Sequence, residues 1–171
     1  MPPGLVPDRG VAARGAGVIT VDRSRVRSSL ARVFTAAKDV ERWPALLPHY
    51  RWVRFHQRRG EGGLVEMAAW RPFGSALRWP TWWMSEMTIE PQVPRIVYRH
   101  VRGITAGMDV AWDFAPENGA VLVTVTHWWE GPRWPLIGAL AADRVIGPVF
   151  IHGIASRTLA GIARAAERTE P

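Results

Sequence analysis

Residues 77–91 read LRWPTWWMSEMTIEP, and this stretch decides the fold class. After a cluster of tryptophans, apolar and polar side chains alternate strictly, which is the period of a half-buried β-strand. Arg78, Glu86 and Glu90 require solvent, so the opposite face of the strand must point inward. That inward face carries Trp79, Thr81, Trp83, Ser85, Met87 and Ile89. Indoles on one inward face predict either a packed core or an apolar pocket.

The same period of two recurs on both sides of this strand. Further strands are expected at 50–59, 63–71, 94–102, 107–115 and 120–130, with short turn signals between them. Short connections predict antiparallel pairing as a meander. The expected inward residues are Val65, Met67, Ala69 and Arg71, then Met108, Val110, Trp112 and Phe114, then Val121, Val123, Val125, His127 and Trp129. The alternation does not orient strand 94–102.

Helical periodicity is confined to the two ends of the chain. A short strand at 17–22 leads to a helix over 25–40, for which Asp22 or Ser24 is the expected N-cap. A short second helix ends near Pro48, and a long helix over 135–168 is kinked or divided at Gly147–Pro148.

This order of elements predicts an α+β fold. A curved antiparallel β-sheet of six to seven strands would wrap around the long C-terminal helix, with two short helices after the first strand. One helix cannot fill a wide curved sheet, so a hollow should remain between them. We expect a single domain over 17–168 and a disordered N-terminal arm over 1–16.

Composition narrows the function classes. Hydrophobic residues make up 47% of the chain, which excludes a disordered protein, and the absence of cysteine excludes disulfides and thiolate metal sites. Without cysteine the compartment is unmarked, and the cytoplasm is the expected default. No segment has 18 uncharged apolar residues in a row, so we expect no membrane span. The histidines lack metal-ligand spacing and no phosphate-binding loop is present, so we expect no metal and no cofactor.

The net charge of +7 invites a nucleic-acid function. Lys38 is nevertheless the only lysine, and the arginines are spread along the whole chain, so nucleic-acid binding is disfavoured. The densest basic run, YRWVRFHQRRG at 50–60, could contact phosphates or an acidic partner protein.

Three segments carry a resemblance to a known family. They are VFTAAKDVERWPALLPHY at 33–50, PTWWMSEMTIEP at 80–91 and the strands from Pro94 to Gly131 with their Thr-His pair. Together with the order of elements, they resemble the START/Bet v 1-like (SRPBCC) superfamily, and within it the polyketide cyclase/aromatase family. The resemblance covers residues 17 to about 168. It implies a helix-grip fold whose pocket promotes aldol cyclisation and dehydration of a poly-β-ketone chain.

The resemblance also implies site residues. The family's proposed pocket groups fall on Trp43, Tyr50, Ser85 and His127, whereas its arginine position falls on Met87. Aldol closure needs a base and a donor for developing negative charge, and a thioether supplies neither. Arg71, if it faces inward, replaces the missing cation. The expected catalytic residues are therefore His127, Ser85, Tyr50 and Arg71; in the purely structural alternative, His127 bonds a backbone carbonyl and Arg71 is a surface residue.

The remaining inward residues are expected to line the pocket. The predicted ligand contacts are Trp43, Met67, Trp79, Trp83, Met87, Met108, Val110, Trp112, Val125, Trp129, Ile151, His152 and Ala155. The outward Trp82 and Trp128 could contact an acyl carrier protein or the second subunit of a homodimer. Two functions stay open: a cyclase, and a non-catalytic carrier of a lipid, quinone or polycyclic natural product. An interaction module built on 50–59 is a third, weaker alternative.

Overall fold

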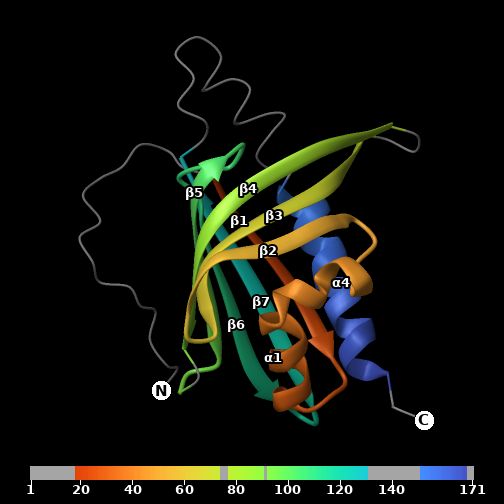
Figure 1. Ribbon diagram of the computed structural model, residues 1–171. Coiled ribbons are helices and arrows are strands. Elements are labelled where there is room, and N and C mark those ends of the chain that lie inside the picture. Colours follow the sequence, from red (N-terminus) through yellow and green to blue (C-terminus); the bar gives the residue numbers. More distant parts are fainter. Residues whose placement is uncertain (1–17, 74–76, 91, 131–150, 169–171) are drawn as a thin grey trace.

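The computed structural model describes residues 18–73, 77–90, 92–130 and 151–168 (Figure 1). The chain begins with β1 (Val18–Val26), α1 (Leu30–Lys38), a 3₁₀ turn η1 (Val40–Arg42) and α2 (Trp43–Leu46). Six strands follow: β2 (Tyr50–Arg59), β3 (Gly62–Phe73), β4 (Leu77–Glu90), β5 (Arg95–Gly103), β6 (Asp109–Glu117) and β7 (Ala120–Trp129). The helix α4 (His152–Glu167) comes last.

The strands form one seven-stranded sheet in the order β1-β7-β6-β5-β4-β3-β2, and every pairing is antiparallel. Figure 1 shows this sheet curving around α4, with α1 beside the same helix. This arrangement confirms the predicted α+β architecture. The bounds of β2 and β4 coincide with the predicted strands 50–59 and 77–90.

The start of the first helix differs from the prediction. β1 continues to Val26, which pairs with Val121 of β7, so residues 25 and 26 are strand rather than helix. The α1 N-cap is Ser29, whose hydroxyl accepts a hydrogen bond from the Arg32 backbone N–H at 3.4 Å. The predicted caps Asp22 and Ser24 are therefore wrong, because the pairing with β7 overrides a local capping signal.

The core lies between the concave face of the sheet and the helices. Every described strand residue that was expected to point inward is buried or nearly so, and the fully buried members include Val65, Val121, Val123 and Val125. On the outer face Trp82 and Trp128 remain 46% and 37% exposed, as the alternation predicts. None of the described helices is both long enough and apolar enough to span a membrane.

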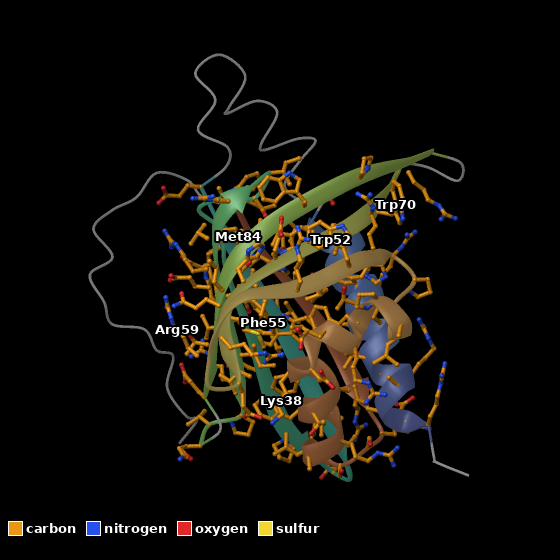
Figure 2. The ribbon with its side chains drawn as sticks, in the orientation of Figure 1. Lys38, Trp52, Phe55, Arg59, Trp70 and Met84 are labelled. Carbon is orange, nitrogen blue, oxygen red and sulfur yellow. The ribbon has the colours of Figure 1, made fainter. Side chains whose placement is uncertain are left out.

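The arginines of β2 are largely engaged with neighbouring side chains. Arg51 lies over the Trp70 ring, and Arg54 lies over Trp52 while bonding Glu66 at 2.8 Å. Figure 2 shows Trp52 and Trp70 among the side chains of this part of the sheet. Partners within the chain hold these arginines, which does not favour the interaction-module alternative.

The predicted arm 1–16 and the predicted kink at Gly147–Pro148 lie outside the described residues.

Candidate functional site

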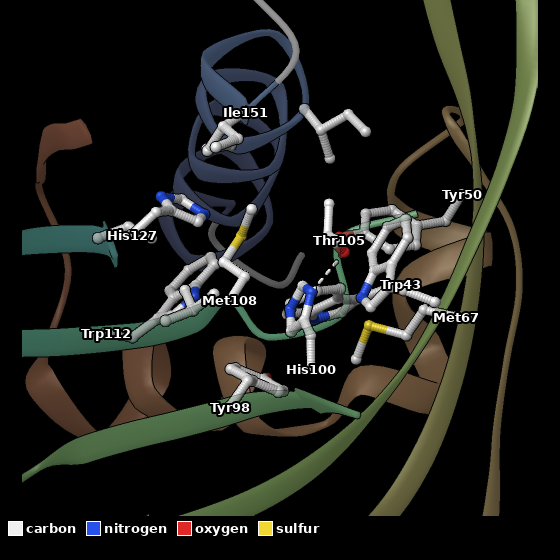
Figure 3. A pocket seen from close by; sticks show the side chains of 15 residues that line it. Trp43, Tyr50, Met67, Tyr98, His100, Thr105, Met108, Trp112, His127 and Ile151 are labelled. Carbon is white, nitrogen blue, oxygen red and sulfur yellow. Dashed lines mark hydrogen bonds between the residues drawn. The ribbon is translucent and has the colours of Figure 1, made fainter. Parts of the chain in front are cut away.

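A hollow of about 70 Å³ lies between the inner face of the sheet and α4 (Figure 3). Its walls come from α2, from strands β2 to β7, from the β5–β6 turn and from the start of α4. The lining residues are Trp43, Tyr50, Met67, Trp83, Tyr98, His100, Thr105, Met108, Val110, Trp112, Val125, His127, Ile151, Ile154 and Ala155. A buried water needs roughly 10–15 Å³ of such volume, so the hollow has room for a few waters or one small molecule.

Aromatic rings form one continuous wall. Trp43 lies 5.1 Å from Tyr50 and 5.8 Å from Trp112, and Tyr50 lies 6.2 Å from Trp83, all between ring centroids. The short helix α2 positions Trp43, whose indole N–H donates to the Ala36 carbonyl at 3.1 Å. The indoles therefore pack partly against one another, and their remaining faces bound the hollow.

His127 is a polar group in this apolar wall. Its Nδ1 lies 3.4 Å from the Thr20 hydroxyl, because β1 and β7 pair these two residues in register. Burial lowers the pKa of His127 to about 4, so the imidazole is neutral near pH 7. Among the described residues, no hydrogen bond involves its Nε2.

His100 is the second imidazole of the hollow. Its Nδ1 lies 2.6 Å from the Thr105 hydroxyl, and its ring stacks on Trp83 with 6.0 Å between centroids. Burial, together with the nearby His127, lowers the pKa of His100 to about 3. This ring is also neutral near pH 7.

Two tyrosines complete the polar groups. Burial raises the pKa of both Tyr50 and Tyr98, so each stays a neutral phenol. Within the described part of the chain, the Tyr98 hydroxyl is buried without a hydrogen-bond partner. No arginine, lysine or carboxylate is among the described lining residues. The site therefore suits uncharged ligands with oxygen atoms.

The structure brings most of the predicted site residues together. Those that line the hollow are Trp43, Tyr50, Met67, Trp83, Met108, Val110, Trp112, Val125, His127, Ile151 and Ala155. The strands place the backbones of Arg71 and Trp79 opposite each other, but their side chains lie outside what the structure describes.

Four predicted residues lie elsewhere. Ser85 and Met87 face inward but are packed within the core, and the Trp129 indole N–H donates to the Ala106 carbonyl at 3.3 Å. The imidazole of His152 is mostly exposed and contacts the buried carboxylate of Asp22 at 2.5 Å. His152 is therefore directed at β1 and not at the hollow.

Sequence reasoning missed Tyr98, His100, Thr105 and Ile154, which also line the hollow. The alternation on β5 gave no clear signal, because Ile96, Val97 and Val101 put apolar residues on both of its faces. In the structure β4 pairs with β5 so that Glu90 lies opposite Arg95 and the inward Ile89 lies opposite Ile96. Tyr98 and His100 follow Ile96 at intervals of two and therefore share its inward face. Thr105 lies in a turn, which carries no such periodic signal.

No group of three His, Asp or Glu side chains able to hold a metal ion occurs in the described ranges.

The model of the family described as "Polyketide cyclase / dehydrase and lipid transport" matches residues 26–145, which is most of the chain. The chain belongs to this family. Its printed description covers both catalysis and transport, so membership alone does not separate the two functions. A comparison with curated proteins finds no match.

Solved structures support the same family fold. The Zhui aromatase/cyclase of a Streptomyces species is 15% identical, with a TM-score of 0.77 over 90% of this chain and 95% of that one. Protein TTHA0849 of Thermus thermophilus is 18% identical, with a TM-score of 0.72 over 86% and 96% of the two chains. A START superfamily protein of Mycobacterium smegmatis is 16% identical, with a TM-score of 0.62 over 88% and 95%. At these identities the likeness establishes the helix-grip fold of this polyketide cyclase/dehydrase family member.

Proposed function

We propose that the protein is a polyketide cyclase/aromatase-like enzyme that closes a ring within an uncharged poly-β-ketone by aldol addition and dehydration. The observation that carries this proposal is His127. It is a neutral imidazole, oriented by Thr20, in a hollow with aromatic walls. A free ring nitrogen in a site with few waters is suited to moving a proton between carbon and oxygen.

The proposed step is balanced without a cofactor. Nε2 of His127 takes a proton from a methylene between two carbonyl groups, and the C–H electron pair becomes an enolate. The enolate carbon bonds to a second carbonyl carbon of the same chain, whose oxygen becomes an alkoxide. This alkoxide takes the proton from His127. Loss of the new hydroxyl with a neighbouring hydrogen then releases one water.

The other wall residues act by shape and hydrogen bonding. The flat indoles of Trp43, Trp83 and Trp112 would hold the chain folded, which favours one ring closure over others. The Tyr50 hydroxyl is proposed as a donor to a ligand oxygen. The hollow is smaller than the roughly 300–1,000 Å³ typical of ligand sites. Longer substrates therefore require wall side chains to move, and Met67 and Met108 are the most adaptable of these.

The test is a His127→Ala variant supplied with a poly-β-ketone made in situ by a ketosynthase and an acyl carrier protein. We expect it to retain ligand binding but to lose cyclised product by about 10²–10⁴-fold, the usual contribution of a general acid–base group. His56→Ala is the matched control, because His56 lies on the exposed side of β2 beside Glu66. An unchanged product distribution with His127→Ala would contradict the enzymatic role.

The alternative is a carrier of an uncharged lipid, quinone or polycyclic product. Met87 at the family's arginine position supports it, as does the lack of charged side chains among the described wall residues. A carrier would return the added compound unchanged, so product analysis of the wild-type reaction separates the two functions.

An acyl carrier protein and a second copy of the chain are the partners predicted from the sequence. The exposed Trp82 and Trp128 support such contacts, because large apolar side chains on an outer sheet face favour association. Light scattering of the isolated protein, with and without the carrier protein, distinguishes these partners.

A further inference from the structure

Two Thr-His pairs stand in the same hollow. Thr20 contacts Nδ1 of His127, and Thr105 contacts Nδ1 of His100. Both histidines use the same ring nitrogen, and no described residue bonds either Nε2. Figure 3 shows both rings among the side chains that line the hollow, with the bond from His100 to Thr105 drawn.

The sheet explains why the two rings face one space. β6 alone separates β5 from β7, and Val110 of β6 pairs with Tyr98 on one side and His127 on the other. His100 lies two residues beyond Tyr98 on the same face. With strands about 4.8 Å apart, the two Cα atoms are on the order of 10–12 Å apart. One small ligand between the rings would contact both.

A purely structural histidine explains His100 less well. His100 is 8% exposed and lines the hollow, and no described residue bonds its Nε2. Polar groups on a largely apolar wall are normally bonded to protein or to water. A ligand oxygen would satisfy this nitrogen.

We propose that His100, oriented by Thr105, is a neutral hydrogen-bond donor to a ligand carbonyl oxygen on the side of the hollow opposite His127. The proposed role places the ring hydrogen on Nε2, with the Thr105 hydroxyl donating to Nδ1. In the cyclase reaction, on which the catalytic part of this inference rests, that Nε2–H stabilises the alkoxide. His100 keeps its own proton, and the alkoxide is neutralised by the proton on His127.

This role accounts for Met87. An arginine would supply a charged donor from β4, whereas His100 supplies a neutral donor from the adjacent strand β5, two residues from the partner of Met87, Tyr98. A neutral imidazole can polarise a carbonyl when its environment prevents protonation. Burial lowers the pKa of His100 to about 3, which keeps the ring in this form.

The binding test uses two probes with one bicyclic skeleton: 1-tetralone, which has a carbonyl group, and tetralin, which has none. The measured quantity is the ratio of their dissociation constants, because changes in apolar packing cancel in it. We expect His100→Phe to lower the preference for 1-tetralone by roughly threefold to tenfold, the value of one neutral hydrogen bond. His56→Ala should leave the ratio unchanged.

The double variant His100→Phe/Thr105→Val guards against misfolding, because it leaves no threonine hydroxyl buried alone. It should bind tetralin as the wild type does and show the same loss of preference. Thr105→Val alone should reduce the preference and change the ¹⁵N shifts of His100 from those of the Nε2–H tautomer. An unchanged ratio in His100→Phe would overturn the donor role, as would an Nδ1–H tautomer in the wild type.

Turnover separates this inference from the proposed function. A wild type that shows the probe preference but yields no cyclised product contradicts the cyclase and leaves the donor role standing. A wild type that cyclises its substrate, with the same rate in His100→Phe, supports the cyclase and overturns the donor role. If neither probe binds the wild type, the donor role fails, whereas the cyclase is still judged by its cyclised product.

Discussion

Ser85 shows how far one residue can be interpreted from its pattern. The alternation on residues 77–90 placed its side chain inward, and the structure confirms this, since Ser85 is fully buried. Its chemical environment could not be predicted, because it depends on neighbours from other strands. Within the described residues, the Ser85 hydroxyl has no hydrogen-bond partner, whereas Thr81 on the same face donates to the Ala69 carbonyl at 3.0 Å.

This contrast predicts opposite effects of removing the two hydroxyls. Ser85→Ala should raise the free energy of unfolding by about 1 kcal/mol, because it removes a buried polar group that lacks a partner. Thr81→Val should lower it by a similar amount, since it breaks a buried hydrogen bond. Urea denaturation measures both. Equal destabilisation by the two variants would show that the Ser85 hydroxyl is bonded.

Among the elements, β5 is where sequence reasoning stopped. Alternation of apolar and polar residues orients β4 and β6, but Ile96, Val97 and Val101 put apolar residues on both faces of β5. A register shift between Met84 and Ser85 adds to the ambiguity, because it leaves Val101 as an extra residue opposite β4. The orientation of His100 therefore depends on pairing with β4 and β6, which a single segment does not encode.

Gly103 lies at the end of this bulged segment and is the predicted weak point of β5. Its φ is 94°, and an added Cβ would lie 2.4 Å from the Trp82 carbonyl oxygen. We expect Gly103→Ala to lower the free energy of unfolding by at least about 1–3 kcal/mol. Gly107→Ala is the matched control: its φ is 87°, but no atom lies within 4 Å of the added Cβ. Equal losses in thermal unfolding would mean that the contact with β4 contributes nothing.

At the scale of the whole molecule, the net charge of +7 and the buried imidazoles make stability depend on pH. Burial lowers the pKa of His127 to about 4 and that of His100 to about 3, from an ordinary value of 6.5. Between pH 6.5 and these lowered pKa values, both imidazoles are protonated in the unfolded chain but neutral in the folded protein. Stability from these groups is therefore complete above pH 6.5 and is lost as the pH falls toward 4.

We expect the free energy of unfolding to fall by up to about 3 kcal/mol for each of these two imidazoles over this range, since one pKa unit corresponds to about 1.36 kcal/mol. Urea denaturation at pH 7, 5.5 and 4.5 measures the loss. The double variant His100→Phe/Thr105→Val should show a shallower dependence on pH. Equal slopes for the wild type and this variant would contradict a neutral, buried His100.

The global architecture was the most predictable part of the molecule. The order of strands and helices, the antiparallel meander and the hollow under the C-terminal helix all follow from periodicity and short connections. The polar contacts within the hollow do not, because Thr20 and Thr105 reach their histidines from an end strand and a turn. Such partners are set by the closed fold rather than by any local pattern.

β1 pairs only with β7 in the described sheet, yet it supplies the hydroxyl that aims His127 and the carboxylate that contacts His152 at the start of α4. Fraying of β1 would therefore break the contact of Thr20 with His127 and that of Asp22 with His152 at the same time. Proton transfer in the hollow therefore requires that β1 stays paired with β7. Conditions that detach this end strand should abolish activity before the rest of the protein unfolds.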